Sequence, residues 1–288
     1  GNWVQLGVDI DAEADGDFNG VSVSLSSDGS RVAIGAHNND GPTGNETSRG
    51  HVRIFDYTPS GTSSWTQVGA DIDGEATSDF SASSISLSSD GSRVAIGATG
   101  NDGNGTNSGH VRIYQYNNNS WSQLGADIDG EAAFDNFGSS VSLSSDGSRV
   151  AIGAIQNDGN GSNSGHVRIF DYNGSAWAQV GADIDGEQTG DYSGMSSVIS
   201  SDGSRVAIGA QLNNNENGIN SGHVRIYTLS PGESYQYAWD VDNGNNSAPS
   251  DGTFRATIAG ADLAGNAYSG TDSITFILDT TAPTVTLT

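Results

Sequence analysis

The stretch VSLSSDGSRVAIGA at residues 141–154 decides the predicted fold, because apolar side chains alternate with small or polar ones on both sides of a turn. This alternation has the period of two that is typical of β-strands. Asp146-Gly147, between the two halves, accepts the positive φ of a tight hairpin turn. The stretch therefore predicts an antiparallel hairpin, and near copies of it surround the same turn at Asp28, Asp90 and Asp202.

Two further blocks recur in step with this hairpin. SGHVRIF at residues 164–170 alternates like a third strand, and WAQVGADI at residues 177–184 supplies a fourth. Copies of the Trp block begin at Trp3, Trp65, Trp121 and Trp177, with spacings of 62, 56 and 56 residues. A four-stranded antiparallel unit repeated at this period is the signature of a β-propeller blade.

The order of the blocks predicts how the ring closes. The chain opens on a Trp block, and the fourth set of the other strands ends near Tyr227 with no W-x-Q-x-G motif after it. We expect the N-terminal strand to complete the last blade, which hides the sheet edges. The prediction is an all-β chain whose residues 1–229 form a closed propeller of four four-stranded blades. The alternative is a fragment of a larger ring.

A family resemblance rests on two elements of the repeat. Phe137-Gly138 followed by Gly153-Ala154 resembles the FG-GAP repeat of integrin alpha-subunit propellers and their bacterial relatives. The Gly-Ala pair recurs at Gly35, Gly97 and Gly209, whereas the Phe-Gly pair occurs once. The family's calcium loop lies between these elements, and here it is shortened to SSDGS. The resemblance therefore implies an adhesive, extracellular propeller without calcium at that hairpin.

Residues 230–288 depart from the repeat. The DLAGN element at residues 262–266 and the DTTAP element at residues 279–283 resemble tandem Ig-like domains of bacterial surface proteins. The segment is short against the roughly 100 residues of a full sandwich. We expect a partial Ig-like segment cut from a longer multidomain chain. A rival interpretation makes Trp239 the start of a fifth blade, but no Q-x-G follows it.

The charge excludes several classes of partner. The chain has 35 Asp plus Glu against 10 Lys plus Arg, a net charge of −25, and all ten cations are Arg. Such a chain is repelled by nucleic-acid phosphates and anionic lipids. Without Cys it has no disulfide and no Cys-ligated zinc. The sequence contains no apolar run of about 18 residues, so we expect no membrane insertion. We expect a secreted or cell-surface protein.

An acidic column, D-x-D-x-E-x-x-x-D, spans the end of each Trp block and the loop that follows it. Carboxylates on flexible Gly-rich loops are suited to Ca²⁺, which takes six to eight oxygen ligands. The sequence predicts a Ca²⁺ site there, although the spacing differs from an EF-hand. The alternative is that these acids cap turns. The columns are Asp9, Asp11, Glu13 and Asp17; Asp71, Asp73, Glu75 and Asp79; Asp127, Asp129, Glu131 and Asp135; and Asp183, Asp185, Glu187 and Asp191.

The loops before each HVRI strand are expected on the same face as the acidic columns. They are rich in Asn, Asp and Gly, so we predict ligand binding by Asp102, Asn104, Asp158 and Asn160, together with His37. His37 with Glu46 is also the one pair suited to acid–base chemistry.

Arginine and histidine recur inside the strands. Arginine in a strand is out of place unless paired, so we expect ion pairs with repeat acids such as Glu131 or Asp129. His51, His110, His166 and His223 are interpreted as packing residues that hydrogen bond between blades, with a metal site as the alternative. The Trp side chains are likewise expected to pack, with sugar binding as the alternative.

The functional hypothesis follows from the near identity of the copies. Catalysis needs residues in different roles, and no nucleophile–base–orienter set breaks the symmetry. The chain is therefore predicted to be a non-catalytic binding or adhesion module that recognises an extracellular glycan or protein through its acidic face. The alternatives are a polysaccharide-active enzyme on a propeller scaffold and a structural spacer in a surface stalk.

Overall fold

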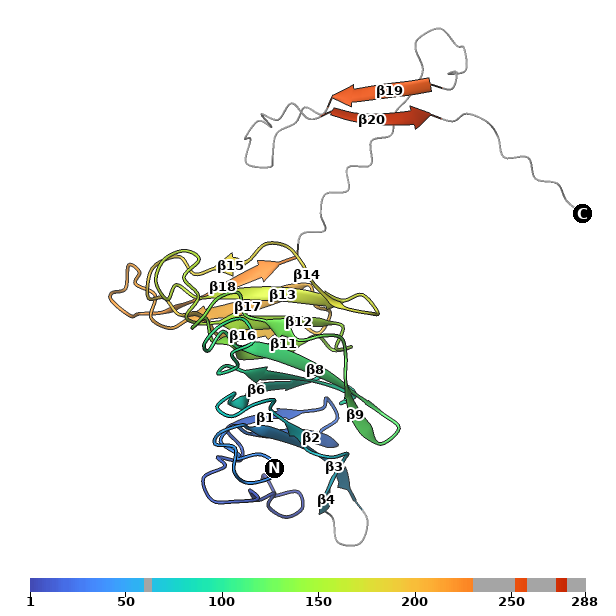
Figure 1. Cartoon of the computed structure of the whole chain (residues 1–288), viewed down its shortest axis with the longest axis vertical. Coiled ribbons are helices and arrows are strands. Elements are labelled where there is room, and N and C mark those ends of the chain that lie inside the picture. The colour runs from blue at the N-terminus through green and yellow to red at the C-terminus, as the bar shows by residue number, and fades with distance from the viewer. Residues whose placement is uncertain (60–63, 230–251, 258–272, 279–288) are drawn as a thin grey trace, which may run out of the picture. The chain divides into compact units, whose positions relative to one another are not determined.

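The computed structural model describes residues 1–59 and 64–229, together with the backbone of two strands at residues 252–257 and 273–278 (Figure 1). The described chain is all-β, as expected. No described segment forms a helix long and apolar enough to cross a membrane. The chain divides into two compact units, Gly1–Ser230 and Pro231–Thr288.

The first unit contains four antiparallel sheets, one for each sequence repeat, here called sheets 1 to 4. Sheet 1 is β1 (Ser22–Leu25), β2 (Arg31–Ala36), β3 (His51–Thr58), β4 (Ser64–Gln67) and β5 (Ile72–Asp73). Sheet 2 is β6 (Ser81–Leu87), β7 (Arg93–Ala98), β8 (His110–Asn117), β9 (Ser120–Gln123) and β10 (Ile128–Asp129). Sheet 3 is β11 (Phe137–Leu143), β12 (Arg149–Ala154), β13 (His166–Tyr172), β14 (Trp177–Gln179) and β15 (Ile184–Asp185). Sheet 4 is β16 (Ser193–Ile199), β17 (Arg205–Ala210) and β18 (His223–Thr228).

The predicted hairpin and strand order are confirmed in sheet 3. Strands β11 and β12 pair with Val141 opposite Ile152 and Leu143 opposite Val150, so the aliphatic residues share one face. The Trp block forms two short strands instead of one, because it turns at Gly181, where φ is 75°. Both short strands pair with β13, one at each end.

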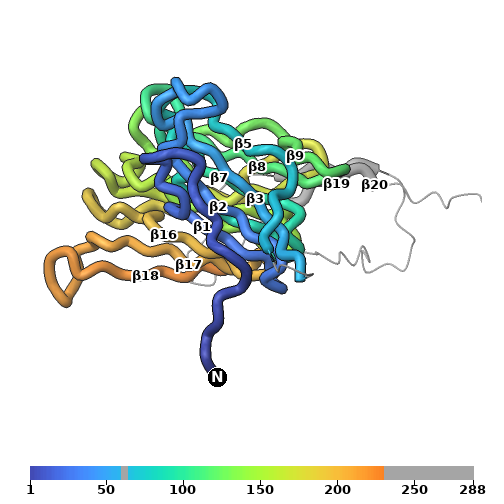
Figure 2. The backbone as a smooth tube through the Cα atoms, turned by 90° about the horizontal axis from the view of Figure 1, so that it is seen from below, coloured from blue at the N-terminus to red at the C-terminus, as the bar shows by residue number. Residues whose placement is uncertain are grey.

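The sheets pack face to face in chain order, and Figure 2 views this stack along its length. The apolar core lies between the sheets. Val52 and Ile54 of sheet 1 pack with Ile85, Leu87 and Ile96 of sheet 2 in one buried cluster. An equivalent cluster joins sheets 2 and 3. Burial is therefore shared between neighbouring repeats, as in other repeat architectures.

Polar bonds recur at each interface between sheets. A serine hydroxyl of one sheet donates to a carbonyl of the next, from Ser22 to Ala82 (2.7 Å), Ser84 to Gly138 (2.7 Å) and Ser140 to Gly194 (2.9 Å). An arginine does the same, from Arg31 to Gly91 (2.9 Å), Arg93 to Gly147 (3.0 Å) and Arg149 to Gly203 (2.7 Å). Backbone amides add Ser27 to Ser89, Ser89 to Ser145 and Ser145 to Ser201. The three interfaces share one pattern.

The side chains of Trp65, Trp121 and Trp177 also join neighbouring repeats, which confirms their packing role, whereas Trp3 is fully exposed and does not pack as expected. Trp121 packs on Tyr116 with ring centroids 5.0 Å apart, and its Nε1 donates to the Val68 carbonyl of the preceding repeat at 2.8 Å. Trp177 donates to Leu124 in the same way, at 2.7 Å.

The predicted closure by an N-terminal strand is not found. Residues 3–10 form no strand, and sheet 4 has three strands among the described residues. The reason is where residues 3–10 lie. Trp65 Nε1 donates to the Leu6 carbonyl at 2.9 Å, and Ile10 packs on the Val32 cluster of sheet 1. The segment thus lies against the first sheet, at the other end of the stack from β18, and it pairs with no strand among the described residues.

The second unit shows one antiparallel pair, β19 (Gly252–Thr257) with β20 (Ser273–Leu278). In the sequence these strands flank the DLAGN element at residues 262–266. The Ig-like assignment stays a prediction, and the fifth-blade alternative at Trp239 lies outside the described residues.

The close approach of the sheets gives a first prediction. A Cβ on Gly153 would lie 2.2 Å from the Gly194 carbonyl oxygen of the next sheet. We expect Gly153→Ala to lower the free energy of unfolding by about 2–3 kcal/mol, because backbone cannot move aside. Urea unfolding measures this. Gly209→Ala is the matched control, since its Cβ would meet only the rotatable Ser196 hydroxyl. An equal loss of unfolding free energy in the control would mean that the glycine-to-alanine change within the strand, and not the contact between sheets, causes the effect.

Candidate functional site

A histidine begins the third strand of each repeat; it is buried where two repeats meet in sheets 1 to 3, and half-buried as His223 in sheet 4. In sheets 1 to 3 this imidazole is about 1% exposed and faces two carboxylates. One carboxylate comes from the acidic column of the same repeat and the other from the preceding column. The side-chain ligand atoms of each set lie within 4.8 Å of one another. The three sets, here called the trios, are Glu13–His51–Asp71, Glu75–His110–Asp127 and Glu131–His166–Asp183.

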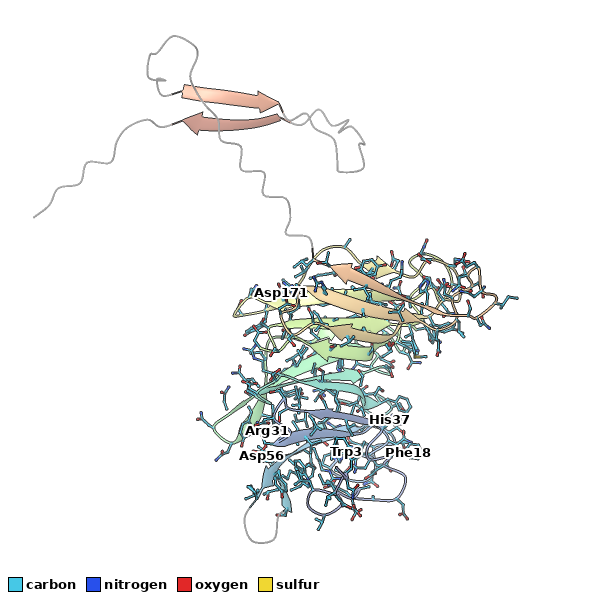
Figure 3. All side chains as sticks on the ribbon, turned by 180° about the vertical axis from the view of Figure 1, so that it is seen from behind. Trp3, Phe18, Arg31, His37, Asp56 and Asp171 are labelled. Carbon is cyan, nitrogen blue, oxygen red and sulfur yellow. The ribbon has the colours of Figure 1, made fainter. Side chains whose placement is uncertain are left out.

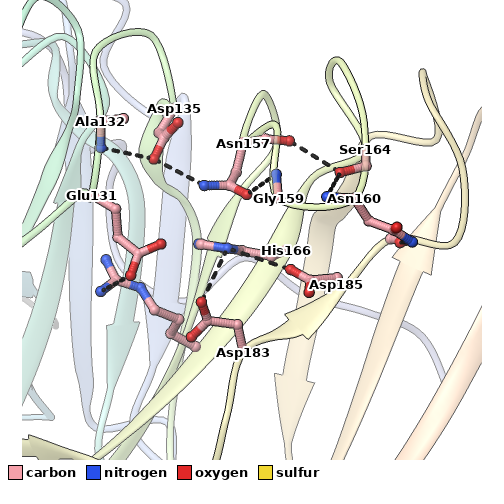
Figure 4. Close-up of polar contacts among 12 residues, drawn as sticks. Glu131, Ala132, Asp135, Asn157, Gly159, Asn160, Ser164, His166, Asp183 and Asp185 are labelled. Carbon is pink, nitrogen blue, oxygen red and sulfur yellow. Dashed lines mark hydrogen bonds and ion pairs between the residues drawn. The ribbon is translucent and has the colours of Figure 1, made fainter.

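The imidazole of each trio makes no hydrogen bond among the described residues. His110 Nδ1 lies 3.8 Å from Glu75 Oε2 and 3.9 Å from Asp127 Oδ2, which exceeds hydrogen-bond length. Its Nε2 is buried without a partner, as in His51 and His166. In Figure 4, His166 Nδ1 lies 4.0 Å from Asp183 and 3.9 Å from Asp185. The packing hydrogen bond expected for these histidines is therefore not made.

Strand pairing positions each trio. His110 stands opposite Asp129 where β10 pairs with β8, which brings the end of the Trp block beside the imidazole. Gln123 Nε2 donates to Asp127 Oδ1 and leaves Oδ2 facing His110. Glu75 comes from the preceding repeat, and Arg112 Nη1, from the same strand as His110, lies 3.5 Å from its other oxygen.

The predicted arginine–carboxylate pairing is confirmed. Arg168 Nη1 lies 3.5 Å from Glu131 Oε1, and its Nη2 donates to the Asp129 backbone carbonyl at 2.7 Å. Two of the arginines that begin the second strands, Arg31 and Arg149, instead pair across their own sheet, whereas Arg93 and Arg205 stand opposite Gln115 and Thr228 and form no ion pair among the described residues, contrary to expectation. Arg149 is held bidentately by Asp171 on the next strand.

Burial sets the charge state of the trios. Desolvation lowers the pKa of His51, His110 and His166, and that of His110 falls to about 4. Desolvation also raises the pKa of Glu75. At neutral pH the imidazole is neutral, so one ring nitrogen carries a lone pair available to a ligand.

The four acids of one column go to different places. The last acid of each column caps its own loop: Asp135 Oδ2 accepts from the Ala132 amide at 3.0 Å and from Asn157 Nδ2 at 3.1 Å. Asp79 and Asp191 bind loop amides in the same way, which is the turn-capping alternative. Asp73 contributes its backbone carbonyl to Arg112. Each trio therefore draws on two columns, and the Ca²⁺ assignment stays a prediction.

The loop residues predicted to bind ligand support neighbouring loops. Asn104 Nδ2 donates to the Gly130 and Glu131 carbonyls at 2.9 Å each, and Asn160 does the same toward Gly186 and Glu187. Asp102 and Asp158 accept the amides of Asn107 and Asn163 at 2.7 Å. These contacts hold the loop of one repeat against the acidic column of the next (Figure 4).

His37 lies between two aromatic rings. Its ring centroid is 5.8 Å from Phe18 and 6.1 Å from Phe80, both edge-on (Figure 3). Its expected acid–base partner, Glu46, forms an ion pair with Arg49 instead. The other copies have no histidine at this position, so the aromatic group marks an asymmetric place on the loop face.

The trios were missed as sets by sequence reasoning. The histidines and acids were each identified, but the ligands of one trio come from segments up to about one repeat apart. The signal was present in the constant offset between each column and the next HVRI strand. Reading that offset requires knowing that consecutive sheets stack in register.

Comparisons with known proteins agree with the repeat. Residues 126–170 match the FG-GAP repeat family, which confirms the expected repeat type there. No curated protein sequence matches the chain. A crystal structure from Bacteroides uniformis, described as a candidate 6-phosphogluconolactonase, is 12% identical with a TM-score of 0.46. The alignment covers 72% of this chain and 57% of that one.

The buried histidines predict a pH dependence in metal-free protein. Folding lowers the pKa of His110 from its ordinary value of 6.5 to about 4. Protonation below pH 6.5 therefore favours the unfolded chain, and stability falls as the pH approaches 4. The slope approaches about 1.4 kcal/mol per pH unit for each such histidine.

Urea unfolding in EDTA at pH 7, 6 and 5 measures this slope. His110→Asn should flatten it, whereas His37→Asn, which removes a half-buried histidine outside the trios, should flatten it less. Stability that is constant or rises from pH 7 to 5 would contradict the assignment of neutral buried imidazoles.

Proposed function

We propose that this chain is a non-catalytic extracellular binding module whose trios hold divalent metal ions and whose loop face recognises a glycan or protein. The observation that carries the proposal is the recurrence of a buried, unpartnered imidazole facing two carboxylates. The near-identical repeats present the same donor set three times. The FG-GAP resemblance supports an extracellular location and the absence of catalysis.

The geometry of the trios fits a metal better than a proton. Two ligands about 2.1 Å from a tetrahedral ion lie roughly 3.4 Å apart. The Nδ1-to-oxygen distances of 3.8–3.9 Å around His110 are close to that value and too long for direct hydrogen bonds. A small inward rotation of the exposed Glu75 carboxylate closes the difference. Water supplies the remaining coordination.

The donor set favours one kind of metal. Imidazole nitrogen with carboxylate suits Zn²⁺ and other first-row divalent ions, whereas Ca²⁺ takes oxygen ligands alone. We therefore propose a first-row ion at the trios. Ca²⁺ bound by the acidic columns is the alternative, and the same titration distinguishes them.

The recognition surface is proposed around the Phe18–His37–Phe80 group. This group combines the exposed aromatic ring of Phe18 with the half-buried imidazole of His37 and belongs to the first two repeats alone. Aromatic faces beside polar groups suit the apolar faces and hydroxyls of a sugar. Because Glu46 is engaged by Arg49, His37 has no acid–base partner there, which supports binding over catalysis.

Metal binding is tested by stoichiometry. Equilibrium dialysis of the dilute, unassociated chain against Zn²⁺, Mn²⁺ or Ca²⁺ should give three first-row ions per chain, one for each trio that is complete within a single chain. His110→Ala should reduce this to two. A bound ion also stabilises the native state, by about 2.7 kcal/mol at a hundred times its Kd.

The matched control is His37→Ala, which removes a histidine outside the trios and should leave three ions bound. Unchanged stoichiometry in His110→Ala would overturn the trio assignment. Binding of Ca²⁺ without Zn²⁺ would transfer the site to the acidic columns.

Ligand recognition is tested on a glycan array and on purified extracellular-matrix proteins. Phe18→Ala should weaken binding at least tenfold, because the ring is exposed and its loss removes contact area without opening the core. Phe134→Ala, another exposed phenylalanine outside the group, is the control. Polysaccharide turnover that disappears in His37→Ala would instead establish the enzyme alternative.

A further inference from the structure

The outer face of the last sheet is built like an interior surface but lies exposed. Val224 and Ile226 of β18 are 67% and 72% exposed, whereas Val111 and Ile113 at the same positions of sheet 2 are 0% and 1% exposed. In sheet 2 these side chains are covered by the next sheet. The end of the stack thus presents the apolar half of an interface that is already formed three times within the chain.

The outer face of the first sheet is the complementary half. Val23 and Leu25 of β1 are 64% and 59% exposed, whereas Ile85 and Leu87 at the same positions of sheet 2 are 8% and 7% exposed. Those residues of sheet 2 pack on sheet 1. The outer faces of sheets 1 and 4 therefore differ from each other, and they correspond to the two opposite sides of an internal interface.

We propose that sheet 4 of one copy docks on sheet 1 of a second copy, so that chains associate head to tail. The occupant is a second copy because it carries the face that each internal interface uses. Consecutive packing places the two faces of one chain at opposite ends of the stack (Figure 1). Such a heterologous contact leaves a free face at each end and continues to further copies.

The polar groups needed for this contact are in place. In the repeated pattern, Arg205 corresponds to Arg149, and its target in the second copy is the Gly29 carbonyl. The Ser196 hydroxyl corresponds to Ser140, with Gly20 as its target. One bond of the pattern is lost, since Val198 replaces the serine that accepts a neighbouring amide in the other interfaces. Val198 is exposed and adds apolar area in its place.

Residues 3–10 of the second copy would supply the missing fourth strand of sheet 4. Within its own chain this segment already lies against sheet 1 as each Trp block lies against the following sheet. By the register of β13 with β14 and β15, Gln5 stands opposite Tyr227 and Ile10 opposite Val224. Strand addition of this kind pairs the open edge of β18.

The same docking completes a fourth trio. His223 Nδ1 lies 3.6 Å from Glu187 Oε2, but no aspartate joins them among the described residues. The residue that corresponds to Asp71 and Asp127 in the Trp block of the second copy is Asp9. Two independent features, the exposed apolar faces and the incomplete trio, thus favour the same partner, a second copy of the chain.

The test uses the full chain in EDTA, so that its outcome is separate from metal binding. Sedimentation over a range of concentrations should show a mass that rises beyond one chain. Val224→Glu with Ile226→Glu removes the last face, and Val23→Glu with Leu25→Glu removes the first. Each variant alone should stay a single chain. Their equimolar mixture should form a dimer that grows no further, because one intact face of each kind remains.

Gly209→Ala supplies a second variant that keeps the fold. In the single chain its Cβ would meet the rotatable Ser196 hydroxyl and lie 3.7 Å from the Ser196 carbonyl oxygen, an ordinary contact, but in the docked pair it would meet the second copy as Gly153 meets Gly194. We expect at least tenfold weaker association with an unchanged unfolding midpoint. A wild-type chain that stays single at every concentration, or a mixture that fails to pair, would overturn the proposal.

Discussion

The close approach of consecutive sheets is the constraint on which the rest of the structure depends. Gly97 and Gly153 face the carbonyls of Gly138 and Gly194 at a distance that leaves no room for a Cβ. At this short distance between the sheets, the hydroxyls of Ser84 and Ser140 reach and donate to those same carbonyls. The glycine of the Gly-Ala element thus sets the distance between consecutive sheets. A larger residue would push the sheets apart, which would break the hydrogen bonds between them and the apolar packing.

This spacing also explains why charged groups lie so deep. With the sheets this close, the histidine and arginine that begin each third strand are covered by the following or preceding column. Desolvation lowers the pKa of both His166 and Arg168, which shows that burial outweighs the nearby carboxylates. The terminal nitrogens of Arg168 contact a carbonyl and a glutamate, although its Nε is buried without a partner. The imidazole of His166 makes no hydrogen bond among the described residues, and this difference distinguishes the histidine as the residue with a lone pair available to a ligand.

Sequence reasoning recovered what is local and missed what depends on stacking. The hairpin at Asp146-Gly147, the strand order and the pairing of Arg168 with Glu131 follow from alternation and charge, so they were predictable. The trios were not, because Glu75 and Asp127 belong to different columns and meet only when sheets stack with a fixed offset. The N-terminal segment failed for a related reason. Its sequence is that of a fourth strand, but a strand forms only beside an open edge.

The acidic charge acquires a structural meaning from this arrangement. Some carboxylates are neutralised locally, since Asp135 binds loop amides and Glu131 faces Arg168. Those of Asp71, Asp127 and Asp183 face a neutral imidazole and have no arginine among their hydrogen-bond partners in the described part of the chain. Within each trio an arginine therefore compensates the charge of the glutamate, as Arg112 does for Glu75, and leaves that of the aspartate. A divalent ion would offset it, and the neutral histidine is the one neighbour that can bind such an ion without adding negative charge.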